Sequence, residues 1–170
     1  MEKYNFQEMS KLPELPDEIQ KLINMNPFEL EDTFNPTLLE KYLFYMPEII
    51  RILGLHMANI KAIKRKIEFE IYLIENSNGG RLASKRSEIL IELSYSIDAA
   101  RFKNEQMRDA YVQSMDSYKE IIEELNSLRA ELTEIESAIE IADKEVWKYI
   151  NLNNNIDNIS KLRTKMNNIL

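Results

Sequence analysis

The sequence predicts an all-α protein built from long, paired helices. Apolar residues recur at alternating steps of three and four over most of the chain, and the positions between them are mostly charged. Neither glycine nor proline occurs after Gly80, although a β-rich chain needs both for tight turns. We therefore expect a long antiparallel helical hairpin or coiled coil with short N-terminal helices, arranged as a helical bundle or an elongated oligomer.

Prolines interrupt residues 1–35, and two Asn-Pro pairs mark helix starts there, Asn26-Pro27 and Asn35-Pro36. Asparagine supplies a capping oxygen, and proline fits the first helical position, where no N–H is needed. Short helices are therefore expected near 17–24 and 27–33, and a long helix is expected to begin at Pro36.

The long helix from Pro36 carries a heptad seam and is expected to end near Glu75. Pro47 costs about 3 kcal/mol inside a helix and Gly54 about 1 kcal/mol, which predicts a bend or restart there. A turn at 76–81 follows, because its two glycines and its asparagines tolerate positive φ. The seam consists of Leu39, Tyr42, Met46, Ile49, Leu53, His56, Ile60, Ile63 and Ile67.

A second helix is expected from Leu82, giving a helical hairpin over 36–150 with its turn at 76–81. Its seam keeps the same spacing from Leu90 to Tyr149, through Leu93, Ile97, Ala100, Asn104, Met107, Tyr111 and Ser114. The first helix is too short to cover the far end of this seam. Either the second helix breaks near Asn104–Arg108 and folds back, or a second copy covers the stripe, and self-association is expected in both cases. The predicted oligomer or partner seam is Tyr118, Ile121, Leu125, Leu128, Leu132, Ile135, Ile139 and Val146.

Asparagines at 151 and 153–155 are expected to interrupt this helix. Residues 151–170 are therefore predicted to form an Asn-rich linker and a short C-terminal helix.

No residue pattern indicates bond chemistry. The chain has no cysteine and a single histidine, His56, which has no carboxylate three or four residues away. Its glutamate pairs lie off the seam, and no phosphate-binding, nucleophile or zinc motif is present. We expect no enzyme activity, no catalytic residues, no cofactor and no metal. No apolar run is long enough to span a bilayer and no signal peptide is evident, so no membrane partner and a cytoplasmic location are expected.

Charge is unevenly distributed in this chain of net charge −7. Residues 105–145 are mostly acidic, and Glu131, Glu134 and Glu136 mark a predicted acidic partner face. The nucleic-acid-binding candidates cluster around the predicted turn, where they could bind phosphates, dock on acidic residues of another copy or form a solvated face. They are Lys61, Lys64, Arg65, Lys66, Arg81, Lys85 and Arg86.

The layout of residues 36–149 resembles the UvsY-like recombination mediators of bacteriophages. The resemblance rests on a long first helix that opens Pro36-Thr-Leu-Leu-Glu-Lys-Tyr and runs through Lys64-Arg65-Lys66, a basic turn region and a long charged second helix. Those mediators are oligomeric helical proteins that help load a recombinase onto single-stranded DNA. The acidic balance and the Asn-rich C-terminal segment depart from that pattern.

Two functions follow as hypotheses. The first is a non-enzymatic, oligomeric helical adaptor from a phage or mobile element that contacts single-stranded nucleic acid, as the resemblance implies. The alternative is a protein-binding module, either a phage assembly component or an acidic inhibitor of a host nucleic-acid enzyme such as an anti-CRISPR.

Overall fold

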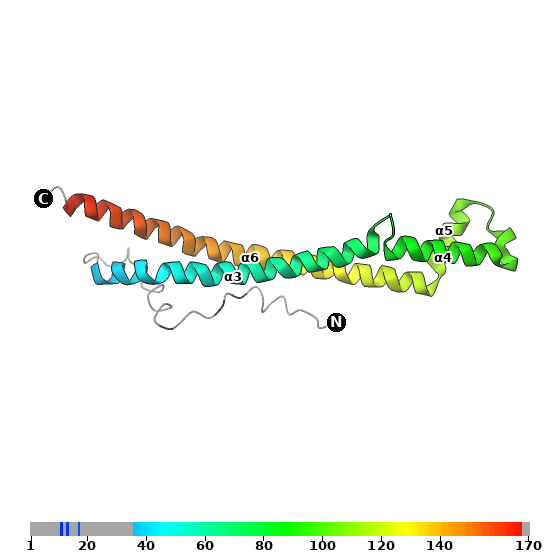
Figure 1. The fold of residues 1–170 in the computed structure, drawn as a ribbon, viewed down its shortest axis with the longest axis horizontal. Coiled ribbons are helices and arrows are strands. Elements are labelled where there is room, and N and C mark those ends of the chain that lie inside the picture. The colour runs from blue at the N-terminus through cyan, green and yellow to red at the C-terminus, as the bar shows by residue number, and fades with distance from the viewer. Residues whose placement is uncertain (1–10, 12, 14–16, 18–35, 168–170) are drawn as a thin grey trace. The chain divides into compact units, whose positions relative to one another are not determined.

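The computed structural model describes residues 11, 13 and 17 and the continuous stretch 36–167, so the helices predicted within 17–33 lie outside the described residues apart from Asp17. The stretch 36–167 confirms the all-α class, because it is helical nearly throughout and the described residues include no strand. Figure 1 shows its elements in chain order, which are α3 (Pro36–Glu75), α4 (Arg81–Tyr95), the 3₁₀ helix η1 (Ile97–Arg101), α5 (Glu105–Ser114) and α6 (Asp116–Asn167).

The chain divides into two compact units, Met1–Lys61 with Ser137–Leu170, and Ala62–Glu136. The helices described in the first unit are the first part of α3 and the last part of α6, and Lys61 Nζ lies 4.0 Å from Asp143 Oδ1. Burial of apolar side chains drives this packing. Among the residues of the first unit whose burial the structure describes, the buried ones are Met46, Ile49, Leu53, Met57, Ile60, Ala138 and Ala142.

The helix α3 begins at Pro36 and ends at Glu75 as predicted, and it continues through Pro47 and Gly54 without a restart. Pro47 removes one backbone hydrogen bond. The residue is exposed, so water can bond the carbonyl that loses its partner. The buried residues Met46, Ile49 and Leu53 keep the 3/4 spacing across this position, so packing of the apolar face outweighs the local cost of the proline.

The predicted turn is present, but the prediction that it forms a hairpin is wrong. In the second unit, Lys64 of α3 bonds Glu136 of α6 at 2.8 Å, and Arg81 of α4 bonds Glu124 at 2.6 Å. Glu75 likewise pairs with Arg129. Partners on α6 therefore have falling residue numbers as the chain passes from α3 into α4. Both helices run antiparallel to α6, and residues 76–80 shift the chain without reversing it.

The geometry of residues 76–80 explains how the chain leaves α3 and re-enters a helix. Asn76 accepts a hydrogen bond from the Asn78 N–H at 3.0 Å through its side chain, and its carbonyl accepts one from the Gly80 N–H at 2.6 Å. Gly79 takes φ +137°, a conformation that side chains disfavour. The turn residues permit the chain either to reverse after α3 or to continue along α6. The chain continues along α6, because this direction buries Ile89 and Leu93 on the apolar face of α4.

The chain reverses instead between α4 and α5, which pack on each other (Figure 1). Ser96 ends α4, and its hydroxyl donates to the Leu93 carbonyl at 2.8 Å. Asn104 caps α5 by accepting a hydrogen bond from the Met107 N–H at 2.8 Å. The fold-back predicted near Asn104–Arg108 is therefore present, although α4 already ends at Tyr95, nine residues before that cap. A second interruption, at Met115, separates α5 from α6.

The predicted linker at 151–155 is wrong, because α6 continues through these asparagines to Asn167. Asparagine costs at most about 0.7 kcal/mol relative to alanine within a helix. Unlike proline, it neither blocks a hydrogen bond nor fixes the backbone outside the helical range. The described part of the segment expected to form a separate C-terminal helix belongs to α6.

The long seam of α6 is covered by residues of the same chain. Ile121, Leu125, Leu128 and Ile135 are buried in the single chain. Tyr118, Leu132, Ile139 and Val146 are half-buried. The structure therefore corresponds to the alternative in which the second helix breaks and folds back, because the fold-back at 96–104 lets α3 and α4 pack along α6.

The seam prediction is also wrong around the reversal. Ile97 is fully exposed at 101%, and Ala100 and Met107 are exposed as well. In α4, Ile89 is buried, whereas Leu90 is only half-buried. The unbroken 3/4 spacing in the sequence crosses a real break at Ser96, so residues beyond it no longer lie on the same face.

Candidate functional site

The predicted basic cluster is largely engaged in ion pairs with this chain's own carboxylates. Lys64 bonds Glu136 at 2.8 Å and lies 3.5 Å from Glu68. Lys85 bonds Glu88 at 2.9 Å. Together with the contacts of Lys61, Arg81 and Arg86, at least five of the seven predicted nucleic-acid-binding residues contact a carboxylate. The cluster also does not surround a chain reversal, because its residues lie along α3 and α4, which both run antiparallel to α6.

These contacts favour the charged forms of the bases. The hydrogen bond to Glu136 is the main reason why the pKa of Lys64 lies above its ordinary value. The hydrogen bond to Glu124 acts in the same direction on the pKa of Arg81. Since all these groups are partly exposed, each pair contributes little stability by itself, and its main effect is to favour one register between helices.

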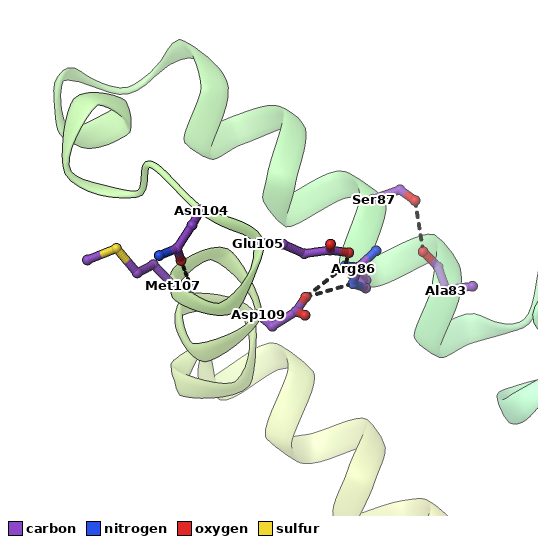
Figure 2. A network of polar contacts seen from close by, with 7 residues as sticks. All are labelled: Ala83, Arg86, Ser87, Asn104, Glu105, Met107 and Asp109. Atoms are coloured by element: carbon purple, nitrogen blue, oxygen red, sulfur yellow. Dashed lines mark hydrogen bonds and ion pairs between the residues drawn. The ribbon is translucent and has the colours of Figure 1, made fainter.

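Arg86 joins α4 to α5 at the fold-back (Figure 2). Its Nη2 and Nε both donate to Asp109 Oδ1, at 2.7 and 3.2 Å, and Glu105 lies 3.9 Å away. The hydrogen bond to Asp109 is the largest cause that raises the pKa of Arg86. One predicted nucleic-acid contact thus links the two helices that reverse the chain.

An exposed aromatic face lies on α3 in the second unit. Phe69, Tyr72 and Leu73 are 59%, 56% and 48% exposed, on the side of α3 opposite the buried Ile67 and Ile74. The two rings stack with their centroids 6.4 Å apart and their planes 21° from parallel. Helical spacing places Arg65 and Lys66, both exposed, one turn before Phe69 on the same side. We call these five residues the aromatic face.

An apolar tip marks the end of α4. Ile91 and Tyr95 lie four residues apart on one exposed side of the helix, and Ile97 follows in η1. Their exposed fractions are 58%, 88% and 101%. The adjoining segment carries Lys103 and Arg108, and neither contacts a carboxylate among the described residues. We call Ile91, Tyr95 and Ile97 the apolar tip.

A shallow cavity of about 410 Å³ opens where α5 meets α6. Tyr118 and Ile122 supply apolar surface, and Lys119 and Glu123 supply charge. The cavity is also lined by Gln113. We call it the elbow cavity.

An acidic row lies along the exposed side of α6 in the second unit, formed by Glu120, Glu123, Glu131 and Glu134. None of the four contacts a basic side chain among the described residues. Of the three residues of the predicted acidic partner face, Glu131 and Glu134 belong to this row, whereas Glu136 faces Lys64 and lies on a different side of the helix.

The aromatic face, the apolar tip, the elbow cavity and the acidic row are the features of the described residues that could contact another molecule. Among residues 36–167 and the three described positions before them, no group of three or more His, Cys, Asp or Glu side chains could hold a metal ion. His56 is half-buried on α3. Within the part of the chain that the structure describes, no helix is long and apolar enough to cross a membrane.

Sequence reasoning missed the aromatic face and the apolar tip. Phe69, Tyr72 and Leu73 lie off the heptad seam, and three large apolar residues at off-seam positions on one helix side are a signal that could have found this face. Ile97 fits the seam spacing, so only the break at Ser96 shows that it is exposed.

Comparison with known proteins identifies no relative: no family model, no curated protein and no solved structure matches the chain.

Proposed function

We propose that this protein is a non-enzymatic helical adaptor that binds a protein partner through the aromatic face. The observation that carries the proposal is the exposure of Phe69, Tyr72 and Leu73 together on one helix side. Large apolar side chains that lie together at the surface mark contact sites, and aromatic residues and arginine are enriched at the centres of protein interfaces. The opposite side of α3 packs against the same chain, so the aromatic face can bind a partner without disturbing the fold, as an adaptor requires.

Charge supports a protein partner over nucleic acid. Most of the predicted cations are neutralised by carboxylates of the same chain, as shown by the contacts of Lys64, Arg81 and Arg86. Affinity for a phosphate backbone grows with the number of cations that displace counterions. The net charge of −7 adds long-range repulsion of a polyanion.

The test compares a variant of the aromatic face with a matched control. Phe69→Ser, Tyr72→Ser and Leu73→Ser are combined in one chain, and Ile141→Ser with Trp147→Ser, both about half exposed in the first unit, are combined in the control. We expect specific partners captured from the source cell to be lost with the first variant and kept with the control. Circular dichroism must show equal helix content in both. Capture of the same partners by all three proteins would refute the proposal.

Single-stranded nucleic acid is a second candidate ligand for the same face. The observation in its favour is the stacked pair Phe69–Tyr72 beside Arg65 and Lys66, since aromatic rings and cations together bind bases and phosphates. This candidate predicts that a fluorescent oligothymidine binds at low salt and dissociates steeply as salt rises. It also predicts loss of binding in the Arg65→Ala, Lys66→Ala double variant. Absence of binding at low salt would exclude it.

A further inference from the structure

We infer that a second copy of this chain docks on the second unit, with the apolar tip of each copy inserted into the elbow cavity of the other. The contact uses none of the residues of the aromatic face. It therefore stands or falls independently of the proposed function.

The first argument is the exposure of the apolar tip in the single chain. Ile97 and Tyr95 are 101% and 88% exposed, although each is large and apolar enough to gain free energy from burial. Neither one closes the fold-back itself, because Ser96 and Asn104 supply its caps. The tip is therefore available to a partner without any change in the packing of α4 on α5.

The second argument is the fit between tip and cavity. The elbow cavity has a volume of about 410 Å³ and a partly apolar lining from Tyr118 and Ile122. An apolar cavity of about 150 Å³ already holds a benzene ring. The elbow cavity can therefore take the side chain of Ile97 or the ring of Tyr95.

The third argument is charge complementarity, and it points to a second copy as the occupant. Lys103 and Arg108 lie in the segment that follows the tip, and neither contacts a carboxylate among the described residues. Glu123 lines the elbow cavity, and Glu120 lies one turn away on the same helix. Lys119 also lines the cavity, but it is paired with Asp116 at 3.1 Å. Asp98 and Glu105 near the tip are paired with Arg101 and Arg86. Lys103 and Arg108 therefore outnumber Glu92 among the remaining charges near the tip, and the remaining charges at the cavity are acidic, which favours this pairing over contact of like surfaces.

Placement of both features in one unit is compatible with a two-fold dimer. In a two-fold dimer each copy gives its tip and receives its partner's tip, so a single kind of contact forms twice and closes the assembly. The contact is small, so we expect a dissociation constant roughly in the micromolar range. A dimer of twice 20.1 kDa should then appear as protein concentration rises through that range.

The first experiment measures mass in solution by sedimentation equilibrium over a concentration series. Ile97→Ser and Ile122→Ser each remove one side of the contact and should weaken dimerisation at least about tenfold. Ile141→Ser is the control, because Ile141 is 53% exposed and lies in the other unit. An unaltered chain that stays monomeric at millimolar concentration overturns the inference. A dimer that both variants leave intact, or species that grow beyond a dimer, also overturns it.

The second experiment exchanges charge, because Ile122 is half-buried and its loss could disturb folding. One variant carries Lys103→Glu and Arg108→Glu, and another carries Glu120→Lys and Glu123→Lys. Each alone should dimerise at least about tenfold more weakly than the unaltered chain. An equimolar mixture should form a heterodimer, since both of its contacts again join opposite charges. A mixture that dimerises as weakly as each variant alone contradicts the docking of the apolar tip in the elbow cavity.

Discussion

Alanine substitution at three isoleucines tests where the buried side of α4 lies and where its seam ends. Ile89 is 2% exposed, Ile91 is 58% exposed and Ile97 is 101% exposed. The structure therefore predicts a steep loss of stability for Ile89→Ala and almost none for Ile97→Ala. An unbroken seam would instead bury Ile97 and make its substitution costly.

The expected magnitudes follow from burial. Ile→Ala removes three carbon atoms, each worth about 0.8 kcal/mol when buried, and leaves a cavity. For Ile89 the sum is about 3 kcal/mol. For Ile91, which is less than half buried, the transfer contribution falls to about 1 kcal/mol, and the higher helix propensity of alanine offsets part of it.

Urea unfolding followed by far-UV circular dichroism measures these differences, provided that the slope with urea is the same for all variants. Submicromolar protein keeps the comparison below the range expected for dimerisation. A loss for Ile97→Ala as large as that for Ile89→Ala would refute the assigned break at Ser96. Equal losses for Ile89→Ala and Ile91→Ala would show that the buried side of α4 is wrongly placed.

Three further predictions concern the turn, the fold-back and the ion pairs. Gly80→Ala should destabilise the chain by about 2 kcal/mol or more in the same assay, because a Cβ there would lie 2.6–2.7 Å from three backbone atoms. The control Gly54→Ala places its Cβ in open space and should stabilise the helix by up to about 1 kcal/mol. A double-mutant cycle with Arg86→Ala and Asp109→Ala should give a coupling energy of about 0.5–1 kcal/mol that shrinks in high salt, since both side chains are about 40% exposed; a coupling of zero at low salt would contradict the contact. The pKa of Lys64 is raised in the folded chain, so its contribution to stability is complete below its ordinary pKa of 10.5 and is lost as pH rises through the raised value. The urea midpoint of unfolding should therefore change less between a pH below and a pH above the raised pKa of Lys64 in the Lys64→Met variant than in the unaltered chain. An equal change in both proteins would argue against the ion pair of Lys64 with Glu136.

The candidate surfaces show which parts of a site a sequence pattern can predict. The acidic composition of α6 was visible in the sequence, and two of the three predicted acidic residues, Glu131 and Glu134, lie in the exposed acidic row. The basic cluster was visible too, but the sequence did not show that Lys64 and Arg86 pair with carboxylates more than twenty residues away. These pairs reduce the positive charge that the cluster can offer to a phosphate. Ion pairs between distant segments depend on register, and register is not a local property.

Sequence alone determined the all-α class, the start of α3 at Pro36 and the end of that helix before the glycines. Helix period, capping residues and glycine positions are local properties, and they need no knowledge of which segments meet. Only the tertiary structure decided that residues 76–80 do not reverse the chain and that residues 96–104 do. A glycine turn permits more than one direction, and the direction taken is the one that buries Ile89 and Leu93 of α4. Because the chain takes this direction, α3 and α4 cover the seam of α6, and Phe69 and Ile97 remain exposed.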